Sequence, residues 1–322
     1  MKNKLLFRIG MGLWFCCFFM ACGEEDITPK IDFPHLYEIV DNPNDPVQHK
    51  RFELYNRYHV PVYFNDTIAR TFVRMDRQGD SVYQVETLDM TWKFTSQENN
   101  LSFGYVYLTE AEKQLKALHT VEKYLESLSV PLMPFSVLVT KSAVTTTGGT
   151  DTDVSSYVGF RVVLITGAEN LDEAGTIKLA AKLKTDMIAY KVANYTSELG
   201  SFNKISQEWY NTKWENLPGT PEDFSSSQRG LFGPLPESDL AEIRTVVGKF
   251  GFLGGQNDNV ISWIGGGMSS PKDKDQDLKM YLDEMLKYSK EKFKERWGHA
   301  SLVMEKYDIL YKIIAEKLEV KL

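Results

Sequence analysis

The first half of the chain carries short runs of apolar and β-branched residues separated by turn residues, a pattern typical of strands. These runs occupy residues 60–64, 71–73, 91–94, 135–140 and 157–166. Between the last two runs, the segment 145–153 is rich in Thr, Gly and Asp, and this composition predicts a flexible loop. The pattern therefore predicts a strand-rich part over residues 51–166.

Apolar residues recur at spacings of three and four over residues 109–128, which predicts a helix. Thr109 is a candidate amino-terminal cap, because Glu112 follows three positions later. Similar periodicity predicts further helices, over 171–198, 239–249, 273–297 and 302–317. Because strands come first and residues 167–322 are helical, we predict an α+β protein with a mixed sheet and packed helices.

The first 21 residues have the composition of an export signal. Three Lys or Arg residues precede an almost wholly apolar run over residues 9–20, and the small residue Ala21 stands before Cys22. The run is shorter than the roughly 20 residues that span a bilayer. Residues 19–22 resemble a bacterial lipobox, with Phe19 in place of the usual Leu. We therefore predict a lipoprotein signal peptide over 1–21, with cleavage before Cys22 and acylation of its thiol.

Residues 22–50 are polar and marked by prolines, which predicts a tether. Its acidic start at 23–26 resembles the surface-export signal of Bacteroidota lipoproteins, and a solvated acidic tether is the alternative. Cys22 is the only cysteine outside the signal, so a disulfide, a thiolate zinc site and a cysteine nucleophile are excluded. The net charge of −7 argues against binding of nucleic acid or anionic lipid through the surface.

Several short motifs occur in an order that resembles the zinc-binding metallopeptidases of Bacteroidota, also described as substrate-import-associated zinc metallohydrolase lipoproteins. The motifs are Lys50-Arg51-Phe52, the strand 160–164, Lys204-Ile205-Ser206, the segment 238–242 and the ending 305–314. The resemblance covers about residues 35–320. It implies a zincin-like metallopeptidase scaffold over 51–322, with zinc chemistry and a place at the outer membrane in nutrient uptake.

The zinc-binding motif of that family is missing from this chain. In the family, the helix before the Lys-Ile-Ser motif carries HExxH, in which two histidines bind zinc and the glutamate activates water. Here Thr185 and Ala189 stand in place of the histidines, and Asp186 stands in place of the glutamate. A shift of one residue would put Tyr190 in the second histidine position, and no alignment recovers a histidine.

The third zinc ligand of the family is also lost, because its position falls on Ser238. Asp239 and Glu242 remain in that motif. Since a catalytic zinc ion typically needs three protein ligands, we expect no bound zinc or other cofactor and no catalytic residue at these degenerate positions. The resemblance still implies that these residues lie together, with the segment 239–242 facing the helix over 171–198.

Two other acidic groups have simpler interpretations than metal binding. Asp273, Asp275 and Asp277 have calcium-loop spacing, with Glu284 at position twelve, but Leu278 stands where the loop needs Gly. We therefore interpret this segment as the start of a helix, where acids are favoured. Asp151 and Asp153 beside two glycines are interpreted in the same way as a solvated loop, with a cation site as the alternative.

Three aromatic residues, Trp209, Tyr210 and Trp214, are candidates for binding a ligand by stacking on a sugar or holding a peptide. Packing in the core is the alternative. Taken together, these features predict a pseudoenzyme: a lipoprotein anchored through Cys22 in the outer membrane, with its domain facing either the surface or the periplasm. We expect it to bind peptide or glycan, or to support their uptake, within an outer-membrane uptake complex, and to bind no nucleic acid. The alternative is an active hydrolase with a non-standard site.

Overall fold

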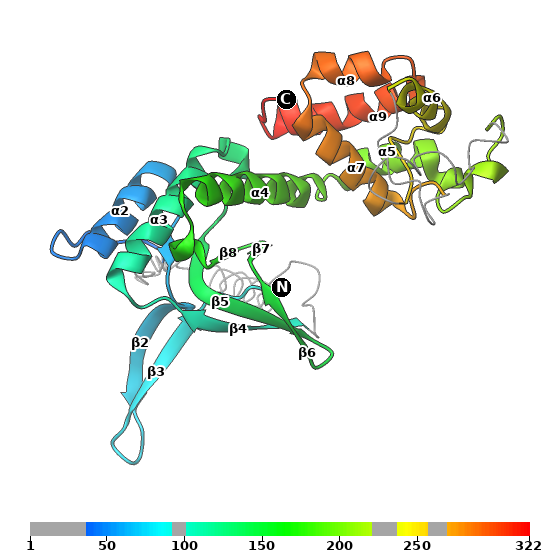
Figure 1. Cartoon of the computed structure of the whole chain (residues 1–322). Coiled ribbons are helices and arrows are strands. Elements are labelled where there is room, and N and C mark those ends of the chain that lie inside the picture. Colours follow the sequence, from blue (N-terminus) through cyan, green and yellow to red (C-terminus); the bar gives the residue numbers. More distant parts are fainter. Residues whose placement is uncertain (1–36, 92–100, 221–236, 257–268) are drawn as a thin grey trace, which may run out of the picture. The chain divides into compact units, whose positions relative to one another are not determined.

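A mixed sheet with helices packed on it forms the first part of the structure (Figure 1). The computed structural model describes residues 37–91, 101–220, 237–256 and 269–322. The second half of the described chain is helical, which confirms the predicted α+β class. The predicted signal peptide, Cys22 and about half of the predicted tether lie outside the described residues.

The sheet is built around one long strand, β5 (Val137–Thr147). The first half of β5 pairs in parallel with β1 (Val62–Tyr63) and with β8 (Val163–Thr166). The short strand β7 (Ser156–Val158) pairs antiparallel with β8 on its other side. The second half of β5 pairs antiparallel with two strands, β4 (Leu101–Tyr107) and β6 (Thr150–Val154).

The start of β5 is buried on both faces, because apolar groups cover each side. Val137 and Val139 belong to a large hydrophobic core shared with the helices. Leu138 and Leu164 belong to a smaller core on the opposite face. This alternation follows from the period of two along a strand, and burial on both sides explains the continuous apolar run.

Three helices pack together with this sheet: α2 (Pro46–Tyr58), α3 (Ala111–Glu126) and α4 (Glu173–Val192). Helix α3 lies between α2 and α4 in Figure 1 and contacts both. Where α3 meets α4, the buried hydroxyl groups of Thr120 and Thr176 lie 3.2 Å apart and share a hydrogen bond. Asp172 caps α4, since its carboxylate accepts a hydrogen bond from the Gly175 backbone at 2.7 Å.

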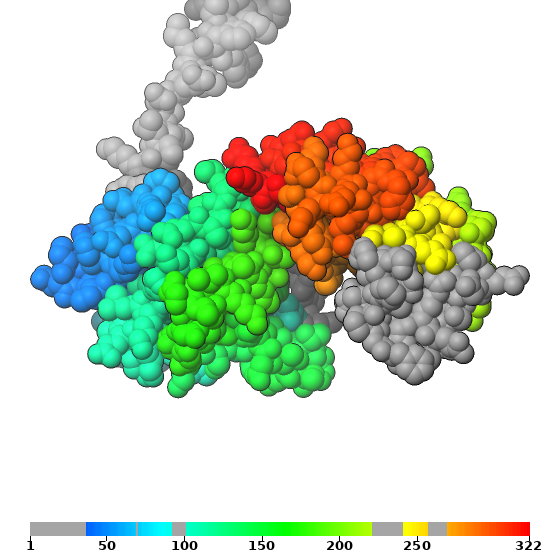
Figure 2. Space-filling view, turned by 45° about the horizontal axis from the view of Figure 1, so that its top comes forward, coloured from blue at the N-terminus to red at the C-terminus, as the bar shows by residue number. Residues whose placement is uncertain are grey.

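The carboxyl-terminal part is a set of packed helices. Its α-helices are α5 (Thr196–Ser206), α6 (Glu237–Gly248), α7 (Lys274–Lys287), α8 (Lys290–Trp297) and α9 (Ser301–Tyr311). A π-helical segment, η6 (Lys312–Lys317), continues directly from α9. Both α7 and η6 contact α4. Figure 2 shows the red surface of this last segment beside the green surface of α3 and α4.

The strands β2 (Thr67–Met75) and β3 (Ser81–Thr87) form a separate two-stranded sheet, which Figure 1 shows as a projecting hairpin. Several of its large apolar side chains are exposed, among them Phe72, Tyr83 and Val85. The rings of Phe72 and Tyr83 meet edge to face across the two strands. Cross-strand contacts of this kind stabilise a hairpin that has little core of its own.

Several predicted elements differ from the observed ones. Residues 145–153, predicted as a loop, form the β5–β6 hairpin, in which Gly148 and Gly149 adopt φ values of +58° and +83°. Two successive residues with positive φ are what a tight hairpin turn requires, and glycine adopts them without strain. The predicted strand 157–166 is divided into β7 and β8, because the chain turns back at Gly159, whose N–H bonds to Val162.

The helix boundaries also differ. The predicted helix 171–198 ends at Val192, and the predicted helix 273–297 is interrupted at Ser289, which caps α8. Helix α2 begins within the predicted tether, because Asp45 caps it and Val47 is buried in the core. Thr109 does not cap α3, which begins after Glu110 without a side-chain cap. Most of the predicted strand 91–94 lies outside the described residues.

Candidate functional site

Thr185, Asp186 and Ala189 lie on α4, as the resemblance implies. The Thr185 hydroxyl donates to the backbone oxygen of Ala181, 3.2 Å away and one turn earlier on the same helix. Asp186 accepts a hydrogen bond from the Lys182 ammonium group at 2.5 Å. Both polar side chains of the degenerate motif on α4 therefore form hydrogen bonds with other residues of the same helix.

Lys182 joins this part of α4 to the sheet. Its ammonium group also donates to the Ser156 hydroxyl on β7 at 3.0 Å. The side chains of Lys182 and Asp186 are 52% and 37% exposed, so this ion pair lies in contact with water. Exposed pairs contribute about 0–1 kcal/mol to stability, and Asp186 has the surroundings of a surface carboxylate.

Lys182 is not among the candidate residues named from the sequence, although a signal for it is present there. Residues four apart on a helix lie on the same face, and Lys182 precedes Asp186 by four positions. This spacing alone predicts the ion pair. The bond to Ser156 had no such signal, because it depends on how β7 lies against α4.

The second half of the degenerate motif lies on α6, which begins at Glu237. Glu242 is exposed there, and the side chains of Ser238 and Asp239 lie outside the described residues. Helix α6 packs against α8 and α9, whereas α4 packs against α3, α7 and η6. The substantial contacts of α6 are therefore with helices other than α4. Since the side chains of Ser238 and Asp239 are not described, a shared site of the two motif halves stays a prediction.

The aromatic candidates are largely part of the core. Trp214 is completely buried beside Phe252, so it cannot stack on a ligand at the surface. Trp209 is half-buried and packs edge to face on Phe250. Tyr210 is half-buried, and its hydroxyl donates to Asp277 at 2.8 Å. The alternative of core packing thus describes Trp214, while Trp209 and Tyr210 keep some exposed surface.

Asp277 and Lys306 form a fully buried ion pair, with 2.5 Å between the carboxylate and the ammonium group. The Lys306 ammonium group lies 4.6 Å from the centre of the Phe202 ring and 5.1 Å from that of Phe252. Burial raises the pKa of Asp277 and lowers the pKa of Lys306, because lost hydration outweighs the attraction between the two groups. The pair links α7 to α9 inside the core.

The acidic residues at 273–284 make structural contacts within the helical part of the protein. This supports the interpretation of the segment as the start of a helix. The Asp273 carboxylate caps α7 by accepting hydrogen bonds from the backbone of Asp275 and Gln276. Asp277 faces Lys306, and Glu284 accepts hydrogen bonds from Arg296 and Trp297. These carboxylates point to different partners, so they do not converge as calcium ligands would.

Asp151 and Asp153 lie on β6 and are exposed. The Thr146 hydroxyl of the neighbouring strand β5 donates to the Asp151 carboxylate at 2.5 Å. Within the described residues, no three His, Cys, Asp or Glu side chains are grouped closely enough to hold a metal ion. In that same part of the chain, every helix is too short or too polar to cross a membrane.

Comparison of the chain with family models, with curated proteins and with solved structures gave no match.

Proposed function

We propose that this chain is a lipid-anchored protein of the outer membrane that binds peptide or glycan in nutrient uptake without hydrolysing it. The lipobox-like segment ending at Cys22 supports the anchor. The order of the family-like motifs supports a zincin-like scaffold, and so does the packing of α3 and α4 with the mixed sheet. Loss of the HExxH histidines supports binding in place of catalysis.

The observation that carries this proposal is the ion pair between Lys182 and Asp186 on α4. Asp186 occupies the position of the glutamate that activates water in the family. A general base must be free to accept a proton from the water that it activates. Here the carboxylate is bonded at 2.5 Å to a cation that is itself held by Ser156. Thr185 and Ala189, on either side of it, offer no imidazole for zinc.

Elemental analysis and a broad peptidase assay of the purified full-length chain test this proposal. We expect far less than one zinc ion per chain and no peptide cleavage that a chelator stops. As a matched comparison, the triple variant Thr185→His, Asp186→Glu, Ala189→His places two imidazoles one turn apart on α4, so it should retain more zinc than the wild type. Stoichiometric zinc in the wild type, or chelator-sensitive turnover, would refute the proposal.

A further inference from the structure

The hairpin of β2 and β3 projects from the mixed sheet, and no other described element packs extensively against either strand (Figure 1). In the described part of the chain β2 pairs only with β3, so the outer edge of β2 is open. The open edge of a strand presents unpaired backbone N–H and C=O groups, and it can add a strand from another chain. Because a two-stranded sheet without its own core is marginally stable in water, an added strand would stabilise this hairpin.

Residues 70–75 of β2 are all exposed, and several of them are apolar. Phe72, Val73 and Met75 are each more than half exposed. The strand register places Phe72 opposite Tyr83, so these two rings share one face of the hairpin. Single exposed apolar residues are common on protein surfaces, but several of them along one open edge indicate an interaction site.

The charged residues of β2 are both positive. They are Arg70 and Arg74, and neither forms an ion pair with a residue that the structure describes. The Arg70 guanidinium group lies 4.0 Å from the centre of the Tyr83 ring, a contact that leaves its N–H donors available to a carboxylate. The nearest acids along the hairpin are placed differently: Glu86 on β3 points to the opposite face from Arg70, and Asp76 accepts hydrogen bonds from the backbone of the turn.

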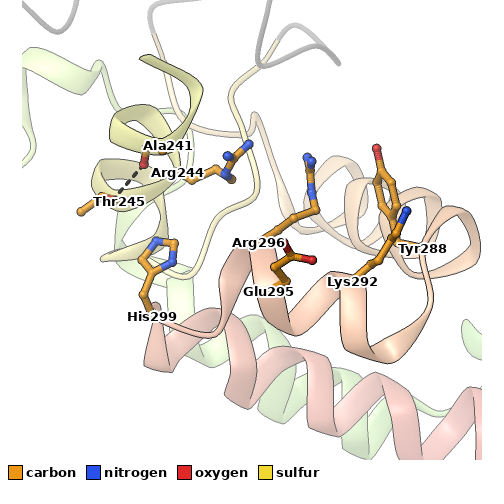
Figure 3. Close-up of a pocket in the computed structure, with 8 residues that line it drawn as sticks. All are labelled: Ala241, Arg244, Thr245, Tyr288, Lys292, Glu295, Arg296 and His299. Atoms are coloured by element: carbon orange, nitrogen blue, oxygen red, sulfur yellow. Dashed lines mark hydrogen bonds between the residues drawn. The ribbon is translucent and has the colours of Figure 1, made fainter. Parts of the chain in front are cut away.

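The arginines of the cavity between α6 and α8 are, by contrast, engaged within the protein. This cavity has a volume of about 540 Å³, and Figure 3 shows Arg244 and Arg296 extending into the space between the two helices. The Nε atom of Arg296 donates to the Glu284 carboxylate at 2.9 Å. Arg244 is buried and also has an interaction partner. The cavity therefore offers no pair of free cations comparable to the one on β2.

The other open edge near the hairpin of β5 and β6 has the opposite charge. In the described part of the chain β6 pairs only with β5, and it carries the exposed residues Asp151 and Asp153. Acidic side chains along an edge repel an acidic strand and discourage its pairing. Of these two edges, only that of β2 is complementary in charge to an acidic strand.

We propose that β2 binds an extended acidic peptide, which adds to the hairpin as a third strand. Backbone hydrogen bonds along the edge hold the peptide, and carboxylates that face Arg70 and Arg74 select it. An apolar side chain between these carboxylates packs on Phe72. A second copy of the chain fits less well, because the arginines of two β2 strands repel each other. The choice of a peptide as ligand rests on the proposed function, but this site is separate from α4.

Calorimetry with the purified full-length chain tests this inference. The probe is the peptide Thr-Glu-Thr-Val-Thr-Glu-Thr, blocked at both ends, in which the two carboxylates are four residues apart, as Arg70 and Arg74 are. One comparison peptide has Lys in place of both Glu residues. The other has Pro in place of the two Thr residues beside Val, so it keeps the charge and loses backbone donors. We expect the acidic peptide to bind at least about fivefold more tightly than either comparison peptide.

Hydrogen exchange of the same chain locates the bound peptide. Amide groups at the open edge of β2 become hydrogen-bonded when a strand is added, so fragments that cover residues 67–75 should exchange more slowly with the acidic peptide present. Fragments that cover residues 150–154, on the acidic edge of β6, should exchange at an unchanged rate.

Substitutions identify the side chains that select the peptide. Arg70→Gln and Arg74→Gln should each weaken binding of the acidic peptide about two- to fivefold, the effect expected from loss of an exposed ion pair. Arg74→Gln leaves the contact between Arg70 and Tyr83 intact, so it tests the site even if Arg70→Gln loosens the hairpin. Arg77→Gln is the matched control, since it makes the same change in the turn beyond the end of β2 and should weaken binding less than either.

Three results would overturn the inference: no binding of the acidic peptide, equal binding of the acidic and the Lys peptides, or slower exchange that spares residues 67–75. Peptide binding that persists unchanged in both Arg70→Gln and Arg74→Gln would also refute this site, and it would leave the proposed function standing. Stoichiometric zinc or chelator-sensitive turnover would refute the proposed function without bearing on the edge of β2. The two failures are therefore distinguishable.

Discussion

At the scale of single residues, two ion pairs in different surroundings show how burial decides what happens when one charged partner is removed. The pair of Asp277 and Lys306 is completely buried, whereas the pair of Asp41 and His49 is partly exposed. Removing one member of a buried pair leaves an uncompensated charge in the core. Removing one member of an exposed pair changes mainly the titration of the other.

Lys306→Met should destabilise the protein by about 3–5 kcal/mol, because it leaves the Asp277 carboxylate buried without its cation. The double variant Asp277→Asn, Lys306→Met should be less destabilised than the single one, since no charge remains and Asn still accepts from Tyr210. Urea unfolding measures both, and Lys312→Met on the exposed side of η6 is the control. Equal loss of stability in the single and double variants would contradict this explanation.

A hydrogen bond that the His49 ring donates to the Asp41 carboxylate raises the pKa of His49 above its usual value of 6.5. Because the folded-state pKa is the higher one, the contribution to stability is fully present below pH 6.5 and is lost as pH rises through the raised value. Asp41→Asn should bring the His49 pKa back toward 6.5. Titration of the His49 ring by NMR checks this, and an unchanged pKa in the variant would show that Asp41 is not the cause.

At the scale of elements, helix ends and turns depend on backbone positions that tolerate few residues. The turn after α6 contains Gly251 with a φ of +75°, and a Cβ atom there would lie 2.8 Å from the Ser206 hydroxyl oxygen. That hydroxyl donates to the Phe250 backbone oxygen, so it is not free to move away. The turn after α6 therefore packs closely on the end of α5, and only glycine at position 251 leaves room for the Ser206 hydroxyl.

Gly251→Ala should lower the free energy of unfolding by more than about 1 kcal/mol, because it adds both backbone strain and a steric clash. Gly200→Ala is the matched control inside α5. No atom lies within 4 Å of a Cβ built there, so helix propensity should raise stability by up to about 1 kcal/mol. Thermal unfolding of both variants gives the comparison, and effects of the same sign would refute it.

At the scale of the whole molecule, the predicted lipid anchor determines where the domain acts. Cys22 is the only cysteine outside the predicted signal. Each buried CH₂ of an acyl chain contributes about 0.8 kcal/mol, so several chains attach a protein stably to a membrane. The predicted anchor and the proposed binding function can therefore each be tested without the other.

Cys22→Ala should abolish lipid labelling and release the protein from the membrane fraction. The reason is that the acyl chains have no other thiol to which they can attach outside the predicted signal. Metabolic labelling with a fatty acid and fractionation after a salt wash measure the two effects. Retention of the variant in the membrane would point to an uncleaved signal helix instead.

Local sequence predicted several of the strands and helices, but not all of them. The periodicity over 109–128 and the aspartates at 273–277 each predicted a helix that the structure contains, because side-chain spacing and capping act between neighbouring residues. The same local reasoning predicted a loop at 145–153, and it failed because pairing of β5 with β6 is decided by the sheet.

Only the tertiary structure decided which distant residues meet. Asp277 and Lys306 are 29 positions apart, and the rings around Lys306 come from α5 and from the turn after α6. The packing of α6 on α8 brought Arg244 to the same cavity as Arg296. All these residues can be found in the sequence. Which of them meet depends on how the helices pack, and no local sequence pattern encodes that packing.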